Sequence, residues 1–313
     1  MSKCLICTRE TGDTGEYHTK CARRLFESPH VPEIPYDLEE LNQLASQVVR
    51  QRVTIPGVQA KMSMEVQKQA GRHPKITITG LWGRYILKPP SQQWDQLPEN
   101  EHTTLSLADA AGIQTVPFGL VRLRSGELSF LTRRIDRRST GQKMAMEDMC
   151  QLTERLTEDK YKGSHEQISG IIKKYSDNPG FDLTRYFDLI LFCYLTGNAD
   201  MHLKNFSLLK EQESGWKLAN AYDLINTRLV MPANKDPEEL ALTLGGKKSN
   251  FNRAVFISFG RNIGLNQRQV ANAISNLEAK LPAFKEIISR SFLNNEMKSK
   301  YLSILDQRSQ VLF

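Results

Sequence analysis

The sequence predicts an α+β fold in two lobes, a small mixed α/β lobe followed by a larger, mainly helical lobe. Three observations lead to this prediction. The 313 residues are enough to bury one large core or two smaller ones. From residue 52 to about 135, apolar and polar residues alternate with the period of strands. Beyond residue 145, apolar residues recur mostly at helical spacing.

Composition places the chain among ordinary globular proteins, with 40% hydrophobic and 25% charged residues. The longest apolar run, Leu189 to Leu195, is too short to cross a bilayer. The N-terminal stretch MSKCLICTRE lacks the apolar segment of a secretory signal, so we expect a cytoplasmic protein with no membrane partner. The sequence leaves open whether the chain is translocated as an effector. The net charge of +7 favours a polyanionic partner, although solvated lysines would give the same total.

Residues 1–35 form a Cys/His-rich leader that ends in the proline-rich segment SPHVPEIP. Cys4 and Cys7 make a C-x-x-C pair, and His18 and Cys21 make a second pair after a glycine-containing loop. Two such pairs suit a tetrahedral, structural Zn²⁺ site with four protein ligands. The alternative is a reduced leader without a ligand, in which the spacing is accidental. Cys150 and Cys193 lie in apolar helical patterns and are expected in the core.

Residues 36–136 are expected to form the first lobe. Asp37 is placed to cap a helix over 38–51, and a second helix is predicted over 99–111, before a glycine. Two hairpins are also predicted, KITITG with RYILK around Gly80 to Gly83, and FGLVRLRSGELSFLTRRID turning at Ser125-Gly126.

Residues 137–313 are expected to form the helical lobe. One further hairpin is predicted in FSLLKEQESGWKLA. The helical periodicity is longest over residues 165–175, 182–196, 267–280 and 283–306.

The stretch GNADMHLKNF places Asp200, His202 and Asn205 directly after the apolar run FDLILFCYLTG. The run reads as a buried helix that ends at a glycine, so the acid should emerge from the core in a loop. The spacing from acid to amide is that of kinase catalytic loops. Asp223 in ANAYDL follows the predicted hairpin and fits a second metal ligand.

A phosphotransferase also needs groups that hold the phosphates of its nucleotide, because its chemistry is chiefly positioning and charge neutralisation. Lys88 ends the strand RYILK, where a fixed ammonium could reach the phosphates. The turn from Val53 to Gln59 could cover them. All these elements occur in the order that a two-lobed phosphotransferase requires.

Taken together, the motifs of this chain resemble those of a known family. The resemblance covers about residues 50–250 and rests on TIPGVQAK, YILKPP, PENEH, LADAAGI, TRRIDRR, EDMCQ, DKY, GNADMHLKNFSLL, LANAYDL and LALTLGGKK. These motifs are similar to those of the HipA family of serine/threonine kinases, the toxins of bacterial toxin–antitoxin modules. The resemblance implies a bilobed protein-kinase-like fold and the use of ATP and Mg²⁺. It also implies a protein substrate, for which the family precedent is aminoacyl-tRNA synthetases.

Matching motifs assign roles to residues of this sequence. The resemblance makes Asp200 the catalytic base, Asn205 and Asp223 the Mg²⁺ ligands, and Lys88 the phosphate-binding lysine. The segment from Arg133 to Asp136 becomes the hinge, with backbone groups at the adenine and Asp136 near the ribose. Further positions matched to the nucleotide pocket are Thr54, Gly57, Gln59, Arg134, Gln151, His202 and Tyr222.

The chain departs from the full-length toxins in two places. A shorter segment precedes Thr54, as in the HipT-type kinases of three-component modules, where a separate small protein replaces the missing subdomain. Implied partners are therefore a HipB-like DNA-binding antitoxin, a HipS-like small subunit, or both, with no direct need for nucleic acid. Thr54 stands where the family has an autophosphorylated serine. A phosphate there would repel the phosphates of ATP, so phosphorylation of Thr54 is expected to switch the kinase off.

Alternatives remain for the protein and for single residues. The chain could be a kinase-fold scaffold that binds an antitoxin, and its Asp-x-His-x-x-Asn loop would also suit a small-molecule or lipid kinase. Lys88 could be a solvated strand end and Gln151 a helix cap. Tyr222 could be a core residue, and His202 could be a structural histidine packed under the loop.

Overall fold

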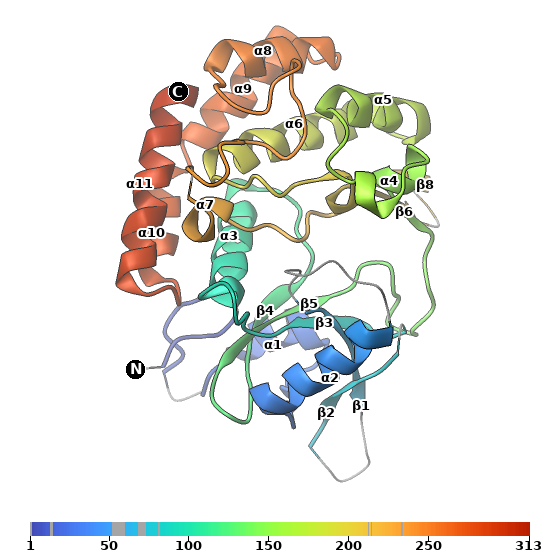
Figure 1. The fold of residues 1–313 in the computed structure, drawn as a ribbon, viewed down its shortest axis with the longest axis vertical. Helices are drawn as coiled ribbons and strands as arrows, with labels where there is room; N and C mark the ends of the chain where they lie inside the picture. The colour runs from blue at the N-terminus through green and yellow to red at the C-terminus, as the bar shows by residue number, and fades with distance from the viewer. Residues whose placement is uncertain are drawn as a thin grey trace. The chain divides into compact units, whose positions relative to one another are not determined.

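The computed structural model describes residues 2–12, 15–51, 60–67, 73–80, 82–211, 213, 215–232 and 234–313. The chain divides into two units, shown in Figure 1 and described separately below. The first unit comprises residues 1–103, 116–142 and 290–293, and the second comprises 104–115, 143–289 and 294–313.

The first unit is built on a five-stranded antiparallel sheet with the order β2-β1-β3-β5-β4. Its strands are β1 Met62–Gln67, β2 Lys75–Ile78, β3 Tyr85–Lys88, β4 Phe118–Arg122 and β5 Leu128–Arg133. Two helices, α1 Thr19–Phe26 and α2 Leu38–Gln51, lie against this sheet (Figure 1). The sheet therefore has one face covered by the chain that precedes it.

The two faces of this sheet have different contents, because successive residues of a strand point to opposite sides. One face forms the core with the leader, α1 and α2, and contains Met64, Leu87 and Leu131 together with Cys4 and Ile6 of the leader. The next residues along the same strands face the other way. Lys88 and Phe130, which pair across β3 and β5, therefore lie on the opposite face.

That opposite face meets the first turns of α3, Leu97–Ala111. The ring of His102 packs edge-on against Phe118 of β4, with the ring centroids 5.5 Å apart. Glu101, the preceding residue of the helix, reaches Lys88 of β3. The order of the strands thus brings a helix residue and a strand residue of opposite charge together in the core.

Several predictions for this unit are confirmed. The helix over 38–51 has Asp37 at its start, whose carboxylate accepts a hydrogen bond from the Glu40 amide at 2.9 Å. Glu40 in turn accepts from the Asp37 amide at 3.0 Å, which completes a reciprocal cap. The hairpin of β4 and β5 turns at Gly126, whose φ of +105° suits glycine.

The predicted hairpin around Gly80 to Gly83 is wrong. The strand KITI and the strand YILK do not pair with each other, because each pairs with an opposite edge of β1. Gly83 is required for a different reason, because a Cβ added there would lie 2.3 Å from the carbonyl oxygen of Met64. Gly83 thus permits a close approach to β1 in place of a turn between its neighbours.

The second unit surrounds one buried helix, α6 Pro179–Leu195, with α5, α9 and α11 packed on it. A small antiparallel sheet, ordered β6-β7-β8, completes the unit. Its strands are β6 Met146–Asp148, β7 Ser207–Glu211 and β8 Gly215–Leu218. The other helices are α4 Met149–Leu152, α5 His165–Tyr175, α7 Thr227–Val230, α8 Arg253–Asn262, α9 Gln267–Glu278, α10 Leu281–Arg290 and α11 Asn295–Leu312, and 3₁₀ turns span Thr157–Asp159 and Leu203–Asn205.

The predicted hairpin of β7 with β8 and the helices near 165–175, 182–196 and 267–280 are confirmed. The single helix predicted over 283–306 is wrong, since the chain forms α10 and α11 with a break between them. Asn294 causes the break, because its side chain accepts a hydrogen bond from the Met297 amide at 2.8 Å and starts a new helix. Helical periodicity alone did not reveal this cap.

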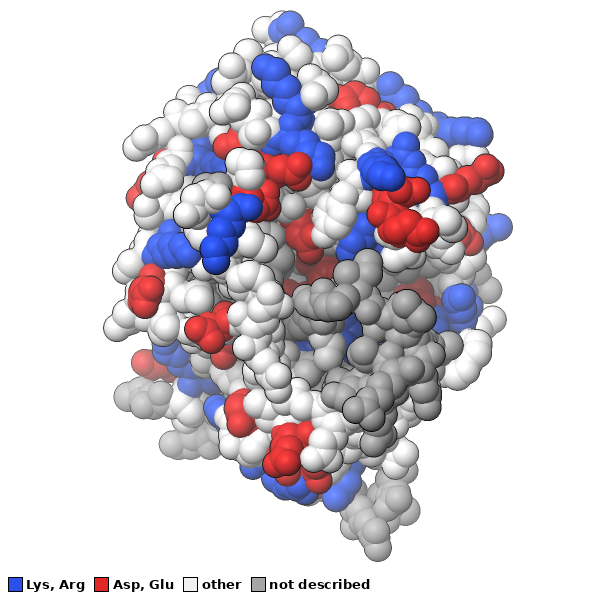
Figure 2. Space-filling view, in the orientation of Figure 1, with Lys and Arg blue, Asp and Glu red and all other residues white. Residues whose placement is uncertain are grey.

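Surface charge and helix length bear on the expected partners. Figure 2 shows Lys and Arg side chains interspersed with Asp and Glu on the face in view, without a continuous basic patch among its described residues. Within the described ranges, no helix combines the length and the apolar character needed to cross a bilayer.

Candidate functional site

The candidate catalytic loop of the second unit begins where α6 ends. The amide of Gly197 donates to the Tyr194 carbonyl at 3.1 Å, and the amide of Asn198 donates to the Cys193 carbonyl at 2.9 Å. This pair of bonds is a Schellman motif, which needs a left-handed residue after the helix. Gly197 supplies it with a φ of +68°. The sequence therefore stops the helix at a fixed point and directs the chain into the loop.

Short polar contacts then fix the loop backbone. The amide of Ala199 donates to the Thr227 hydroxyl at 3.0 Å, and that hydroxyl donates to the Gly197 carbonyl at 3.0 Å. The amide of Asp200 donates to the side chain of Asn198 at 3.1 Å. Because the backbone on both sides is held, the direction in which the Asp200 carboxylate leaves the chain is also fixed.

The carboxylate of Asp200 is partly exposed and has a specific donor. The hydroxyl of Tyr161 donates to its Oδ1 at 2.6 Å. Burial raises the pKa of Tyr161, and the neighbouring Asp200 charge raises it further, so the phenol remains a donor at neutral pH. The Tyr161 ring also stands edge-on to His202, with centroids 5.1 Å apart. One tyrosine thus contacts both the acid and the histidine of the loop.

His202 is buried, with 6% of its surface exposed. Burial lowers its pKa, although the carboxylates of Asp200 and Asp223 act in the opposite direction. The imidazole is therefore neutral near pH 7 and adds no positive charge to the loop. The ring packs against Tyr161, and its place in the nucleotide pocket stays a prediction.

Asn205 ends the 3₁₀ turn Leu203–Asn205 and lies close to Asp200. Its amide nitrogen donates to the Asp200 carbonyl at 3.0 Å, so the amide oxygen is turned away from that carbonyl. Asp223 adopts a left-handed backbone with φ of +57°. Such a conformation is uncommon outside glycine and costs free energy, and it often occurs at functional positions. Asn205 thus offers an amide oxygen and Asp223 a carboxylate, and such hard oxygen donors are the ligands that Mg²⁺ prefers.

Tyr222 and Gln151 have structural partners. The Tyr222 hydroxyl lies 2.6 Å from the Ser207 hydroxyl and donates to the Lys204 carbonyl at 3.1 Å, which ties it to the loop. The Gln151 side chain accepts a hydrogen bond from the Asp148 amide at 2.8 Å and forms the capping box of α4. The helix-cap interpretation therefore describes the Gln151 side chain in this structure.

In the first unit, Lys88 is buried rather than solvated, with 3% of its surface exposed. Its ammonium lies 2.5 Å from a carboxylate oxygen of Glu101 and 5.4 Å from the centre of the Phe130 ring. A charge this deep in the core is stable only with a partner. The carboxylate of Glu101 is that partner, and it fixes where the ammonium stands.

The predicted hinge holds a second charged cluster. Arg134 donates two hydrogen bonds to the Asp136 carboxylate, at 2.9 and 2.8 Å, and Arg137 donates a third at 2.5 Å. Burial works to raise the pKa of Asp136, but the two arginines outweigh it and the pKa falls below its usual value. Arg134 and Asp136 are therefore side-chain partners of each other.

The remaining predicted residues fall into two groups. Thr54, Gly57 and Gln59 lie outside the described residues. The four leader residues come together, because the ligand atoms of Cys4, Cys7, His18 and Cys21 lie within 4.8 Å of one another.

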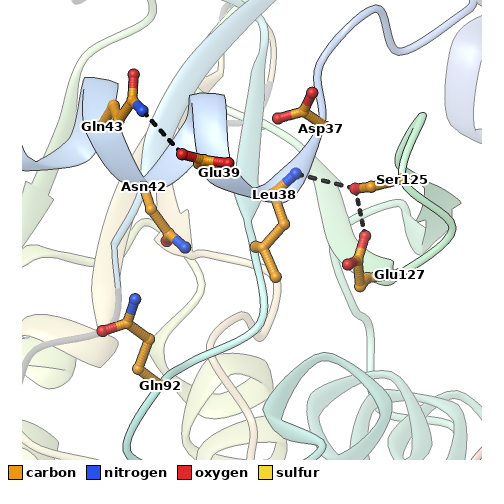
Figure 3. Close-up of a pocket in the computed structure, with 8 residues that line it drawn as sticks. All are labelled: Asp37, Leu38, Glu39, Asn42, Gln43, Gln92, Ser125 and Glu127. Atoms are coloured by element: carbon orange, nitrogen blue, oxygen red, sulfur yellow. Dashed lines mark hydrogen bonds between the residues drawn. The ribbon is translucent and has the colours of Figure 1, made fainter.

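An open hollow of about 650 Å³ lies at the start of α2 (Figure 3). The Leu38 amide donates to the Ser125 hydroxyl at 3.0 Å there, and that hydroxyl donates to Glu127. Its lining consists of Asp37, Leu38, Glu39, Asn42, Gln43, Gln92, Ser125 and Glu127. No predicted site residue that the structure describes is among them, so the hollow gives no support to a nucleotide site.

Sequence reasoning missed two residues that the structure places at the centre of these clusters, Tyr161 and Glu101. Both lie in motifs that carry the family resemblance, DKY and PENEH, which was the available signal. Nothing in the local pattern said which distant residue each would contact. Tyr161 is 39 positions from Asp200, and Glu101 is 13 positions from Lys88.

Solved structures with a similar arrangement of helices and strands define the fold of this protein. The HipA toxin of Shewanella oneidensis, solved with HipB and operator DNA, matches with a TM-score of 0.68 at 19% identity, over 90% of this chain and 75% of that one. The proinflammatory kinase CtkA of Helicobacter pylori matches with a TM-score of 0.56 at 15% identity, over 80% of this chain and 94% of that one. The fold is therefore the bilobed, kinase-like α+β fold, as the sequence predicted.

Sequence comparison then gives the family. The model of the HipA-like C-terminal domain matches residues 53–284, and the chain belongs to this family. A putative kinase of Haemophilus influenzae is 28% identical over 289 residues, which are 84% of this chain and 82% of that protein. The putative kinase Y4dM of Sinorhizobium fredii is 31% identical over 188 residues, which are 56% of this chain but only 45% of that protein.

Proposed function

We propose that this protein is an ATP- and Mg²⁺-dependent serine/threonine protein kinase of the HipA/HipT toxin type. The observation that carries the proposal is the loop in which Tyr161 and Asn205 hold Asp200 from two sides. This arrangement fixes a partly exposed carboxylate in one orientation, as a base for a substrate hydroxyl requires. The kinase-like fold and the relatives named putative kinases support the same conclusion.

Each residue then has a defined task. Asp200 accepts the proton of the substrate hydroxyl while that oxygen bonds to the γ-phosphorus of ATP and the bond to the β-phosphate oxygen breaks. The Tyr161 hydroxyl orients the accepting carboxylate. Asn205 and Asp223 would hold Mg²⁺, which neutralises charge on the phosphates.

The residues of the first unit would hold the nucleotide. Lys88 would bind the α- and β-phosphates, and its ion pair with Glu101 keeps the ammonium in place. The segment from Arg133 to Asp136 would meet the adenine and ribose, as the family resemblance implies. The arginine pairs keep the Asp136 carboxylate ionised and oriented for a hydroxyl.

The proposed substrate and partners rest on the resemblance to the family. A protein hydroxyl, for which aminoacyl-tRNA synthetases are the precedent, would be the acceptor. An antitoxin would be the partner, because the similar Shewanella protein was solved with HipB. Thr54 would be the site of self-phosphorylation, and a phosphate there would repel the phosphates of ATP and switch the kinase off.

Radiolabelled ATP, given to purified protein with bacterial lysate and Mg²⁺, tests the proposal. We expect labelled lysate proteins with the wild type and none with Asp200→Ala, whereas Asp223→Ala should also weaken nucleotide binding. Asp95→Ala is the matched control, because Asp95 is exposed and lies in neither cluster. Normal labelling by Asp200→Ala would contradict the assignment. Label in small molecules or lipids alone would favour the other kinase classes, and no label at all would favour a binding scaffold.

A further inference from the structure

The Cys/His cluster of the leader has no part in the proposed chemistry, yet it is the most concentrated set of metal-binding side chains in the described residues. We propose that Cys4, Cys7, His18 and Cys21 bind one Zn²⁺ ion, and that the bound ion holds the leader on the edge of β4, where it positions the helix that carries Glu101. The metal site itself is independent of the proposed function. The effect of the ion on the position of Lys88 rests on the proposed function, in which Lys88 binds the phosphates of ATP.

The distances agree with a tetrahedral ion. Zinc–sulfur bonds of about 2.3 Å and zinc–nitrogen bonds of about 2.0 Å place neighbouring ligand atoms about 3.5–3.8 Å apart. His18 Nδ1 lies 3.3 Å from the sulfur of Cys7 and 3.9 Å from that of Cys21. All four ligand atoms lie within 4.8 Å of one another. Contraction of the widest separation by about 1 Å at most would bring the four atoms to bonding positions around one centre.

The histidine is oriented as a metal ligand. The other ring nitrogen of His18, Nε2, lies 2.9 Å from the Glu10 carbonyl oxygen. A carbonyl can only accept, so Nε2 carries the hydrogen and Nδ1 presents its lone pair to the three sulfurs. A hydrogen bond from the second nitrogen to a carbonyl is the usual support for a zinc-bound histidine.

The backbone also shapes both pairs. The first pair lies on a tight turn, in which the Thr8 amide donates to the Cys4 carbonyl at 2.9 Å and Thr8 has a φ of +62°. The second pair lies at the start of α1, where His18 precedes the first turn and Cys21 follows within it. Three thiols and an imidazole in so small a volume are the ligand set of structural zinc sites.

The leader lies along the outer strand of the sheet. The Leu120 amide of β4 donates to the Leu5 carbonyl at 2.8 Å, and the Tyr17 hydroxyl donates to the Leu120 carbonyl at 3.0 Å. A Cβ added at Gly119 would lie 2.7 Å from the side chain of Ile6, so only glycine admits this approach. The leader thus covers a strand edge that would otherwise expose unpaired backbone groups.

The same turn reaches α3. The carbonyl of Ile6, which lies between the ligands Cys4 and Cys7, is 2.9 Å from Nε2 of the buried His102. Burial lowers the pKa of His102 to about 4, so the ring is neutral and donates through Nε2. Glu101 is the next residue and holds Lys88. Loss of the metal should therefore loosen this part of α3 and with it the position of the ammonium.

Metal analysis of the purified full chain is the first test. We expect about one zinc per chain, absent from the double variant Cys7→Ser/Cys21→Ser and unchanged in Cys150→Ser and His30→Ala. Cobalt substitution of the wild type should give the absorption spectrum of a tetrahedral thiolate site. This measurement tests the site even if the double variant fails to fold. Iron in place of zinc, a Cys4–Cys7 disulfide, or no metal from zinc-replete medium would overturn the site.

Hydrogen exchange of the wild type, before and after zinc chelation, tests the second part. Amides of β4 and of residues 100–103 should lose protection on chelation, whereas those of α9 should not. His102→Phe should keep its zinc but lose protection over residues 100–103. Unchanged exchange after complete zinc removal would overturn the positioning role. Both readouts are separate from phosphoryl transfer, so an inactive protein with a zinc-dependent α3 would count only against the proposed function.

Discussion

The buried ion pair of Lys88 and Glu101 allows a direct test of whether the two charges in the core of the first unit depend on each other. The two side chains are 4% and 3% exposed, and their charged atoms are 2.5 Å apart. Removal of one partner leaves the other charge buried and alone, which costs about 3–5 kcal/mol. Replacement of both by apolar residues is close to neutral in other proteins. We therefore expect Lys88→Met and Glu101→Leu each to destabilise strongly, and the double variant to cost much less than their sum.

The chain offers a matched control pair. Lys75 and Glu33 also form an ion pair in the first unit, but their side chains are 51% and 56% exposed and 3.4 Å apart. An exposed pair contributes about 0–1 kcal/mol. Neutralisation of this pair should therefore change stability little, and its two single substitutions should be nearly additive.

Urea unfolding, followed by tryptophan fluorescence, measures these differences. Trp216 belongs to the second unit, so a Trp216→Phe background leaves the two tryptophans of the first unit as reporters. A double-mutant cycle then gives the coupling free energy between Lys88 and Glu101. Additive single costs no larger than those of the control pair would refute the claim that these charges depend on each other.

Three further predictions concern the second unit. Gly197→Ala should destabilise the protein by about 1–2 kcal/mol, because its φ of +68° disfavours a side chain and a Cβ would lie 3.0 Å from an oxygen of Asn226. The control Gly170→Ala, at an open helical position, should not destabilise it. Equal urea midpoints for the two variants would contradict this prediction. Tyr161→Phe should lower kcat roughly tenfold or more, because it removes a hydrogen bond to a charged group, and KM and Tm should change little. An unchanged kcat would show that the tyrosine does not orient Asp200. Burial lowers the pKa of His165 to about 3, so below about pH 6.5 the unfolded chain binds a proton at this residue and the folded chain does not. The free energy of unfolding should therefore fall by about 2 kcal/mol from pH 7 to pH 5 because of this group alone. His165→Asn should show a smaller loss over that range, and equal losses would contradict the assignment.

Features that depend on neighbours along the chain could be predicted from the sequence. The reciprocal cap at Asp37, the turn at Gly126 and the helix stop at Gly197 all use residues a few positions apart, whose chemistry can be read directly. The same holds for the order of Asp200, His202 and Asn205, and for the two chelating pairs of the leader. The kinase-like class followed from these local features, taken in order along the chain.

Features that depend on partners far along the chain could be seen only in the folded protein. Strand β1 lies between two strands that the sequence suggested would pair, since the edge that a strand joins is set by the packing of the whole sheet. Glu101 and Tyr161 are ordinary polar residues of their own segments. Burial gives Glu101 a role as the counter-charge of Lys88, and chain packing brings Tyr161 within 2.6 Å of Asp200. A buried charge or an oriented carboxylate requires a partner, but local sequence does not specify which residue the fold will bring to it.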